Sequence, residues 1–368
     1  MRSTTSGRPQ MSRRARSARL IRPAGIRAAT LIASMALVVL AAACSSSSKA
    51  GTASATAGQG AASSQDAASS QSATSNSQPV ASGSEPAVTG AFDAQPTIAI
   101  PKTKPPTTTK VQVVTKGTGK PVAAGDLAVV NGYGRTWTNE TAFENTFGSD
   151  TPPDTLPVGT GQISMTGLDK ALVGVPIGSR VLIVIPPSEG FGEVSSLPTG
   201  VKKTDTAVIV FDVIASYAAD AGPSGSAVSN GGGALPTVTS TVLNTKPTLA
   251  IPKTAAPTKL SVTTLVQGTG PVVAKGQELV VQYVGQIWAS GKEFDSSWSR
   301  KLPSAFPVGE GQLIAAWDTG LVGVKVGSRV MIVAPPGDAY GSAGQPSAGI
   351  TGTDTLVFVV DVLGAYNS

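Results

Sequence analysis

Short apolar, β-branched runs separated by glycine and proline turns dominate the C-terminal third of the chain. Such runs predict strands, and three of them cover residues 279–284, 329–334 and 355–363. Segment 312–322 instead shows helical spacing, at Leu313, Ile314, Trp317 and Leu321, which predicts one short amphipathic helix. Several antiparallel strands and a single helix packed on one sheet face predict an α+β domain.

This pattern occurs twice, because two stretches of the chain repeat one another. Residues 96–103 (PTIAIPKT) return as residues 247–254 (PTLAIPKT), and residues 178–181 (GSRV) return as residues 327–330. We therefore expect two homologous domains of about 120 residues, each large enough for its own core. Their predicted bounds are 93–218 and 246–368, and residues 219–245 are predicted to be a Gly/Ser-rich linker.

The residues before the first domain have a different composition. Residues 44–92 are mostly Ser, Ala, Thr, Gly and Gln, with hardly any large apolar side chain. Such a segment cannot bury enough surface to offset the loss of backbone entropy, so we predict a disordered tether. As a coil it has a root-mean-square length of roughly 40 Å, which would hold the folded domains away from a membrane surface.

Residues 1–43 have the features of an export signal. They contain many arginines and no acidic residue, and their apolar stretch 28–43 is shorter than the ~20 residues that span a bilayer. The segment ends in Leu-Ala-Ala-Ala before Cys44, the only cysteine. This ending resembles the lipobox of bacterial lipoproteins, which predicts a lipid on Cys44 and an anchored protein on the extracytoplasmic face of the cell membrane. The alternative is cleavage at the Ala-x-Ala sequence, which would release a secreted protein.

Charge and histidine content narrow the function classes. The formal net charge is +6, but the leader's arginines account for it and the remaining residues are slightly acidic, so no nucleic-acid partner is expected. The sequence contains no histidine, which removes Ser-His-Asp and Cys-His catalysis and the commonest transition-metal ligand. We expect no metal and no cofactor, so an enzymatic role would use hydrogen bonds, shape and desolvation.

The second domain concentrates the candidate chemistry of a chain in which only 5% of residues are aromatic. Its main candidates are Tyr283, Phe294, Asp295, Trp317 and Tyr340. An aromatic-walled pocket with one carboxylate suits a substrate that needs no proton transfer, and a proline imide is such a substrate. Each residue alone also has a simpler explanation, since Trp317 could be plain core and Asp295, which precedes two serines, could serve only a turn.

In this order the residues of the second domain resemble those of the FKBP-type peptidyl-prolyl cis–trans isomerases over essentially all of residues 247–368. The resemblance implies a twisted antiparallel sheet wrapped around one short helix, and isomerisation of X-Pro bonds. It implies catalytic roles for Tyr283, Asp295 and Tyr340. It implies substrate contacts for Phe294, Arg300, Leu313, Ile314, Trp317, Ile350 and Phe358. Ser304 stands where the family often has another aromatic residue, which should affect ligand preference, including that for a macrolide inhibitor.

The repeat supplies its own comparison, because the first domain keeps the framework and changes the pocket. The corresponding pairs are Tyr283 and Gly132, Asp295 and Glu144, Trp317 and Leu168, Tyr340 and Phe191, Phe358 and Ile209, with Ile314 near Ser164. We predict little or no isomerase activity in the first domain, and a role in binding client chains or in spacing the active domain.

Three functions are compatible with these observations. The first is a prolyl isomerase, acting as a monomer on proline-containing polypeptides, that assists the folding of exported proteins. The second is a non-catalytic binder or chaperone for proline-containing segments. The third, a structural envelope lipoprotein, is disfavoured because a spacer has no need to keep Tyr283 and Trp317 together.

Overall fold

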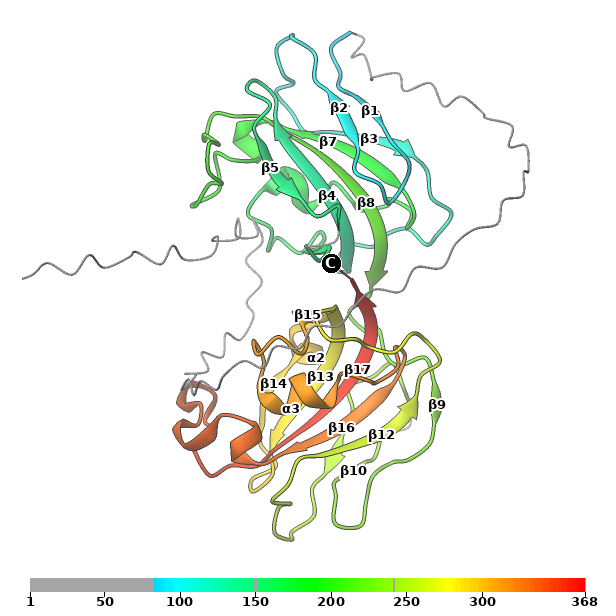
Figure 1. Ribbon diagram of the computed structural model, residues 1–368, viewed down its shortest axis with the longest axis vertical. Helices are drawn as coiled ribbons and strands as arrows, with labels where there is room; N and C mark the ends of the chain where they lie inside the picture. The colour runs from blue at the N-terminus through cyan, green and yellow to red at the C-terminus, as the bar shows by residue number, and fades with distance from the viewer. Residues whose placement is uncertain (1–82, 149–150, 241, 368) are drawn as a thin grey trace, which may run out of the picture.

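Figure 1 shows the computed structural model, which describes residues 83–148, 151–240 and 242–367. These residues form two halves, each built on its own antiparallel sheet. The predicted signal segment, Cys44 and the greater part of the predicted tether lie outside the described residues. No helix in the described part of the chain is long and apolar enough to cross a membrane.

The first half has a sheet of order β3-β7-β8-β4-β5, with β6 paired to β4. Its strands are β3 (Lys110–Thr115), β4 (Leu127–Thr136), β5 (Ala142–Asn145), β6 (Asp154–Pro157), β7 (Arg180–Ile185) and β8 (Ala207–Tyr217). A hairpin of β1 (Ala87–Thr89) and β2 (Thr97–Ala99) precedes the sheet. The helical elements are α1 (Thr166–Asp169) and the 3-10 turn η1 (Pro187–Glu189).

The second half repeats this plan with one more strand, in the order β14-β13-β17-β16-β12-β9 and with β15 paired to β13. Its sheet strands are β9 (Ser226–Ala227), β12 (Ser261–Gln267), β13 (Glu278–Ile287), β14 (Glu293–Ser296), β15 (Ser304–Pro307), β16 (Arg329–Ala334) and β17 (Leu356–Tyr366). Its hairpin is β10 (Thr237–Val238) with β11 (Leu249–Ala250). The helical elements are α2 (Ser297–Arg300), α3 (Ala315–Gly320), and the 3-10 turns η2 (Pro336–Asp338), η3 (Gly341–Ala343) and η4 (Pro346–Ala348).

Both faces of each sheet are covered around its central strands, which explains why β7 is apolar at every position after Arg180. In β7, Val181 and Ile183 point into the core beneath α1, whereas Leu182 and Val184 point to the opposite face. That opposite face is covered by the hairpin, through residues such as Ile98. The hairpin therefore completes the fold of each half, although it lies outside the sheet.

The structure corrects two predicted boundaries. Residues 83–92 were assigned to the tether, yet Ala87–Thr89 forms β1. The predicted linker 219–245 contains β9 and β10, and Val238 within it is buried. Composition misleads here because strand pairing uses backbone groups, which a Gly/Ser-rich segment supplies as well as any other.

Predicted and observed elements agree best where buried residues are continuous. The strand predicted at 329–334 coincides with β16, and those predicted at 279–284 and 355–363 lie largely within β13 and β17. The helix predicted over 312–322 is shorter, because Ile314 is extended (φ −61°, ψ 146°) and precedes its first turn. The second half also has a one-turn helix, α2, which the pattern did not predict.

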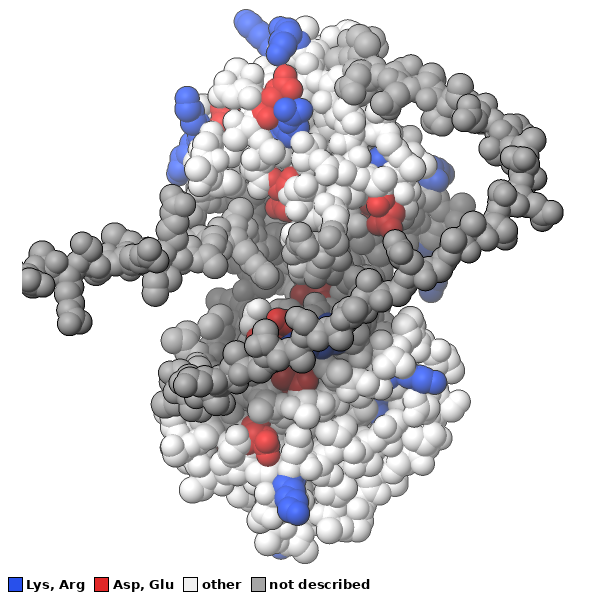
Figure 2. Space-filling view, in the orientation of Figure 1, with Lys and Arg blue, Asp and Glu red and all other residues white. Residues whose placement is uncertain are grey.

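The two halves touch where β8 and β17 end, near the C-terminus in Figure 1. The hydroxyls of Tyr217 and Tyr366 are hydrogen-bonded, and Gln282 Nε2 donates to the backbone oxygen of Ala219 at 2.8 Å. On the face shown in Figure 2, charged side chains are scattered over a mainly uncharged surface.

Candidate active site

A closed network of three polar side chains lies in the second half. The Tyr283 hydroxyl donates to the Asp295 carboxylate, which also accepts from the Arg300 guanidinium. Arg300 donates to the Tyr283 hydroxyl at 2.8 Å, and its guanidinium carbon lies 5.4 Å from the centroid of the tyrosine ring. Because each group is held by the other two, the network fixes the orientation of the carboxylate and of the tyrosine.

Local structure explains how Arg300 returns to a carboxylate only five residues earlier. Helix α2 makes one turn, with the Ser296 side chain accepting from the Ser299 N–H at its start and Lys301 in the left-handed conformation (φ 57°) at its end. Asp295 also accepts from the Ser296 N–H at 2.8 Å. Asp295 itself lies within β14 and Ser296 caps α2, so the Asp295 carboxylate is available to Tyr283 and Arg300.

Aromatic rings meet around Trp317. Its ring centroid lies 5.2 Å from that of Tyr283 and 5.5 Å from that of Phe358, both in edge-to-face geometry. Phe294 in turn meets Phe358 at 5.6 Å. The indole Nε1 of Trp317 is buried and has no hydrogen-bond partner among the described residues. A buried donor without a partner costs free energy, so this N–H is suited to a bound polar group.

Sequence reasoning missed one ring of this cluster. Phe306 lies 5.7 Å from Trp317 and 6.4 Å from Tyr283, centroid to centroid. It is two positions after Ser304 in β15, and residues i and i+2 of a strand share a face. The alternation of side chains along β15 could have identified Phe306. This ring supplies an aromatic wall from the same strand as Ser304, the position at which the family often has an aromatic residue.

The remaining predicted residues join the same cluster. Ile314 and Ile350 are buried in it, and Leu313 and Tyr340 pack against it while partly exposed. The backbone N–H of Ile314 has no acceptor within the described ranges, whereas its carbonyl accepts from the N–H of Trp317 at 2.9 Å. The structure thus brings together all ten residues that sequence reasoning proposed, with Arg300 at the rim.

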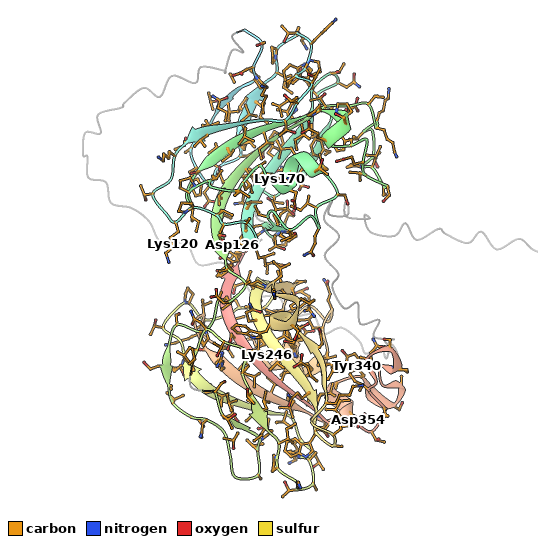
Figure 3. The ribbon with its side chains drawn as sticks, turned by 180° about the vertical axis from the view of Figure 1, so that it is seen from behind. Lys120, Asp126, Lys170, Lys246, Tyr340 and Asp354 are labelled. Atoms are coloured by element: carbon orange, nitrogen blue, oxygen red, sulfur yellow. The ribbon has the colours of Figure 1, made fainter. Side chains whose placement is uncertain are left out.

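Burial raises the pKa of both tyrosines at this site. Desolvation, reinforced by the charge of Asp295, raises the pKa of Tyr340 to about 12. Desolvation also raises the pKa of Tyr283, and the neighbouring Asp295 adds to that increase. Tyrosine hydroxyls are protonated at physiological pH in any case, and these shifts extend that state further into the alkaline range. Tyr340 lies at the outer side of the second half (Figure 3).

The corresponding region of the first half is filled by its own side chains. Phe143 and Phe191 pack edge to face at 5.0 Å, and Met165 and Phe191 are fully buried. Gly132 replaces Tyr283, and a Cβ there would lie 2.7 Å from Cε1 of Phe211. A ring at position 132 and the Phe211 ring in its present position are therefore incompatible.

One predicted correspondence is wrong by a residue. Ile314 and Met165 are the equivalent residues, since each directly precedes the helix of its half. The Ile314 carbonyl accepts from the Trp317 N–H, and the Met165 carbonyl accepts in the same way from the Leu168 N–H. Ser164 was assigned because the loop before the helix differs in length between the copies. The side chain that enters the helix in the first half is thus a buried methionine, which adds to the filling of that region.

Within the described residues, no group of three or more Cys, Asp or Glu side chains is arranged to hold a metal ion.

Comparison with known proteins identifies the family. A model of the family described as FKBP-type peptidyl-prolyl cis-trans isomerase matches residues 118–214 and 270–363, together just over half of the chain. "FK506-binding protein" of Streptomyces anulatus is 40% identical over 118 residues, which are 32% of this chain and 95% of that protein. "Probable FK506-binding protein" of Corynebacterium glutamicum is 40% identical over 122 residues, 33% of this chain and 98% of that protein. "Peptidyl-prolyl cis-trans isomerase Fkbp12" of Drosophila melanogaster is 37% identical over 105 residues, 28% of this chain and 95% of that protein. With a match in each of its two halves, the chain belongs to the FKBP-type peptidyl-prolyl cis–trans isomerases.

Proposed function

We propose that the isomerase activity of this protein resides in its second half and that the first half is inactive. The observation that carries the proposal is the contrast between two equivalent regions. In the second half, Tyr283, Asp295 and Arg300 form a closed network beside the rings around Trp317. In the first half, Gly132, Leu168 and the buried Phe191 stand at the positions of Tyr283, Trp317 and Tyr340.

The chemistry required is rotation about an amide bond. Resonance gives that bond a barrier of ~18–20 kcal/mol, while cis and trans X-Pro forms differ by only about 0.5–1 kcal/mol. A dry aromatic pocket disfavours the planar, polar amide relative to the twisted form, in which conjugation is lost. No nucleophile or general base is needed, which agrees with a chain that has no histidine.

Three groups would position the substrate during rotation. The rings of Trp317, Phe294 and Phe358 would hold the pyrrolidine ring. The Ile314 N–H and the Tyr340 hydroxyl would bind substrate carbonyls on either side of the proline. Asp295 would act through its hold on Tyr283 and Arg300, and would polarise the pocket.

An exchange of equivalent residues tests this proposal in the full chain. Trp317→Leu, which copies Leu168, should abolish most isomerisation of a proline tetrapeptide, whereas Leu168→Trp should leave the rate unchanged. Retained turnover in Trp317→Leu would place the activity elsewhere. Absence of turnover in the unaltered chain would favour the alternative function, a non-catalytic binder of proline-containing segments.

We further propose that the protein assists folding of exported polypeptides while anchored by a lipid on Cys44. The support is the leader sequence with its lipobox-like ending. Expression in a bacterial host with labelled palmitate should label the protein, and Cys44→Ser should remove the label and release the protein to the medium. Equal release of both proteins would instead indicate ordinary signal cleavage.

The names of the two bacterial relatives suggest a ligand to test. Binding of FK506 to the second half is proposed because the pocket retains its aromatic walls, including Phe306. Calorimetric titration of the chain with FK506 should show one site, and Trp317→Leu should remove it.

A further inference from the structure

One short segment of the second half serves both the site and the contact between the halves. Leu302 and Ala305 pack against the apolar cluster in which the halves meet. Their neighbours Arg300, Ser304 and Phe306 belong to the site, where Arg300 donates to the Ser304 hydroxyl at 3.2 Å. The buried members of the contact cluster come from both halves, namely Leu127, Val129 and Val280.

Strand β15 is supported by another strand on one edge alone. Within the described ranges it pairs with β13 and with no other strand, and it lies on the side of the second half that faces the first (Figure 1). Successive side chains of a strand point to opposite faces, so Ala305 faces the contact while Ser304 and Phe306 face the site. Packing at the contact therefore holds the strand from behind the site.

A buried path of hydrogen bonds joins the same two places. Gln282 Nε2 donates at 2.8 Å to the backbone oxygen of Ala219, two residues beyond the end of β8. The Gln282 side-chain oxygen accepts from the Ser297 hydroxyl, and Ser297 Oγ accepts from the Tyr283 N–H at 2.7 Å. Gln282 and Ser297 are both fully buried, and in such surroundings each bond of a network strengthens its neighbours.

The first half closes the equivalent path within itself. Asn131 stands at the position of Gln282, and its Nδ2 donates at 3.0 Å to the carboxylate of Asp93, in the turn of its own hairpin. Thr146 takes the place of Ser297 and accepts from the Gly132 N–H at 2.7 Å. The second half instead uses a backbone oxygen that follows the last strand of the first half.

We propose that the first half positions the active site of the second half. The contact holds β15, which carries Phe306 and the Ser304 acceptor of Arg300. The path through Gln282 holds the backbone of Tyr283 and the first residue of α2. Small misplacements of groups that position a substrate lower turnover strongly, so the isomerase site is fully formed only with the halves in contact.

This inference rests on the proposed function, since it concerns the site of the second half. It gives the inactive half a task that needs no pocket of its own. The residues of the contact and of the Gln282 path are positioning residues, because they act through Tyr283, Arg300 and Phe306.

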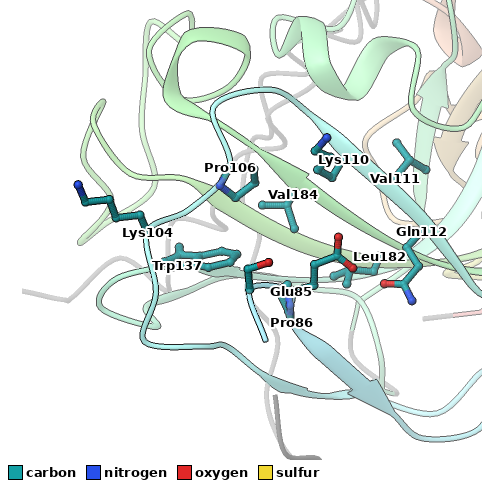
Figure 4. Close-up of a pocket in the computed structure, with 11 residues that line it drawn as sticks. Glu85, Pro86, Lys104, Pro106, Lys110, Val111, Gln112, Trp137, Leu182 and Val184 are labelled. Carbon is teal, nitrogen blue, oxygen red and sulfur yellow. The ribbon is translucent and has the colours of Figure 1, made fainter. Parts of the chain in front are cut away.

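The first test places a charge in the contact of the full chain from the side of the first half. Ile214→Glu should lower kcat/KM for a proline tetrapeptide about threefold to tenfold, whereas Ile214→Leu, which copies Leu363, should retain the rate. Val111→Glu is the control for an added charge, since Val111 is outside the contact cluster and lines a pocket of about 430 Å³ on β3 (Figure 4). A full rate in Ile214→Glu would overturn the proposal.

A spectroscopic signal from Phe306 separates positioning from loss of folding. Chains labelled with 4-fluorophenylalanine give a fluorine resonance for Phe306, which is assigned by its absence in Phe306→Leu. Ile214→Glu should shift or broaden this resonance while the amides of β16 keep their protection in hydrogen exchange. An unchanged resonance would show that the contact does not hold the ring.

A second variant decides the matter if Ile214→Glu does not fold. Gln282→Met removes the bond to Ala219 and should lower kcat/KM within the same range, about threefold to tenfold. Asn131→Leu breaks the equivalent path of the first half and should leave the rate unchanged. Equal rates in these two variants would contradict the proposal. Absence of turnover in the unaltered chain would count against the proposed function, and the Phe306 resonance would still measure the effect of the contact.

Discussion

The hydroxyl of Tyr340 illustrates how a pocket without histidine can act on a bond that needs no proton. It packs against the aromatic cluster, and burial together with the charge of Asp295 raises its pKa to about 12. In the proposed mechanism its contribution is a directed hydrogen bond, while Tyr283, Asp295 and Arg300 hold one another in place. Function at this scale depends on placement rather than on titration.

Tyr340→Phe should lower kcat/KM for a proline tetrapeptide about threefold to tenfold, the value of one hydrogen bond. Because the pKa of Tyr340 is raised to about 12, the hydroxyl does not titrate between about pH 6 and pH 9, and the ratio of the two rates should stay constant across that range. Tyr133→Phe, in the first half, should have no effect. A ratio that changes with pH would mean that a titrating group takes part.

Gly132 leaves room for the Phe211 ring in the first half, where the second half has Tyr283. Gly132→Tyr, which copies Tyr283, should destabilise the protein by about 1–3 kcal/mol through overpacking, because even a Cβ would lie 2.7 Å from the Phe211 ring. Adding Phe211→Val, which copies Val360, should restore at least half of the loss. Urea unfolding measures both, and equal loss in the single and double variants would contradict the steric explanation.

At the scale of elements, the buried arginines explain why each half carries a hairpin. The Arg180 side chain is fully buried, pairs with Asp212 at 2.7 Å, and donates to the backbone oxygens of Gly90 at 2.8 Å and Ala94 at 2.6 Å. Arg329 repeats the arrangement with Asp361 and the oxygen of Leu243. One side chain thus satisfies a buried carboxylate and anchors the turn of the hairpin.

Arg180→Met should cost about 3–5 kcal/mol, because it leaves Asp212 buried without its partner. In the double variant with Asp212→Leu, most of this stability should return, since no uncompensated charge remains. The hairpin should stay unanchored in both variants, so amides of residues 87–99 should exchange faster while those of β8 recover in the double variant. Full protection of the hairpin in the double variant would show that the arginine does not anchor it.

The elements also show which parts of the structure can be read from sequence. Strand β16 was predictable because its six buried residues are bounded by turn residues on both sides. Strands β9 and β10 were not, since they pair through backbone groups within a Gly/Ser-rich segment and leave little apolar pattern. At the site, the resemblance to the family predicted which side chains lie together. Phe306 was not among them, because it could be placed there only once β15 was known to put Phe306 and Ser304 on the same face.

At the scale of the whole molecule, the two halves meet through equivalent residues. Tyr217 and Tyr366 occupy the same position of β8 and β17, and their hydroxyls are bonded to each other. The contact also contains the equivalent pairs Val129 with Val280 and Ile214 with Leu363. Self-complementary contacts of this kind are typical of two-fold dimers, so the duplicated halves pack like the subunits of a dimer on one chain.

Glu278 departs from this symmetry. Glu278 stands where the first half has Leu127, and burial raises its pKa from 4.5 to about 7. It acts on Asp154 of the first half, whose own pKa is raised well above its usual value by burial and then by the charges of Glu144 and Glu278. The Glu278 carboxyl therefore interacts by charge with the Asp154 carboxyl across the contact between the halves.

A carboxyl group whose pKa is raised on folding binds protons more tightly in the folded state, so it lowers stability as pH rises. For Glu278 the loss of stability should begin near pH 4.5 and be complete above about pH 7. At about 1.4 kcal/mol per pKa unit, it amounts to at most about 3 kcal/mol.

Glu278→Leu, which copies Leu127, should therefore stabilise the chain at pH 8 and have a much smaller effect at pH 4.5. Urea unfolding of both proteins at the two pH values measures the difference, and Glu310→Leu, an exposed glutamate of the same half, is the control. Because the gain belongs to the contact, hydrogen exchange at pH 8 should slow most in β8 and β17, where the halves meet. A stabilisation independent of pH would mean that the introduced leucine side chain improves apolar packing alone and that the Glu278 carboxylate contributes no penalty.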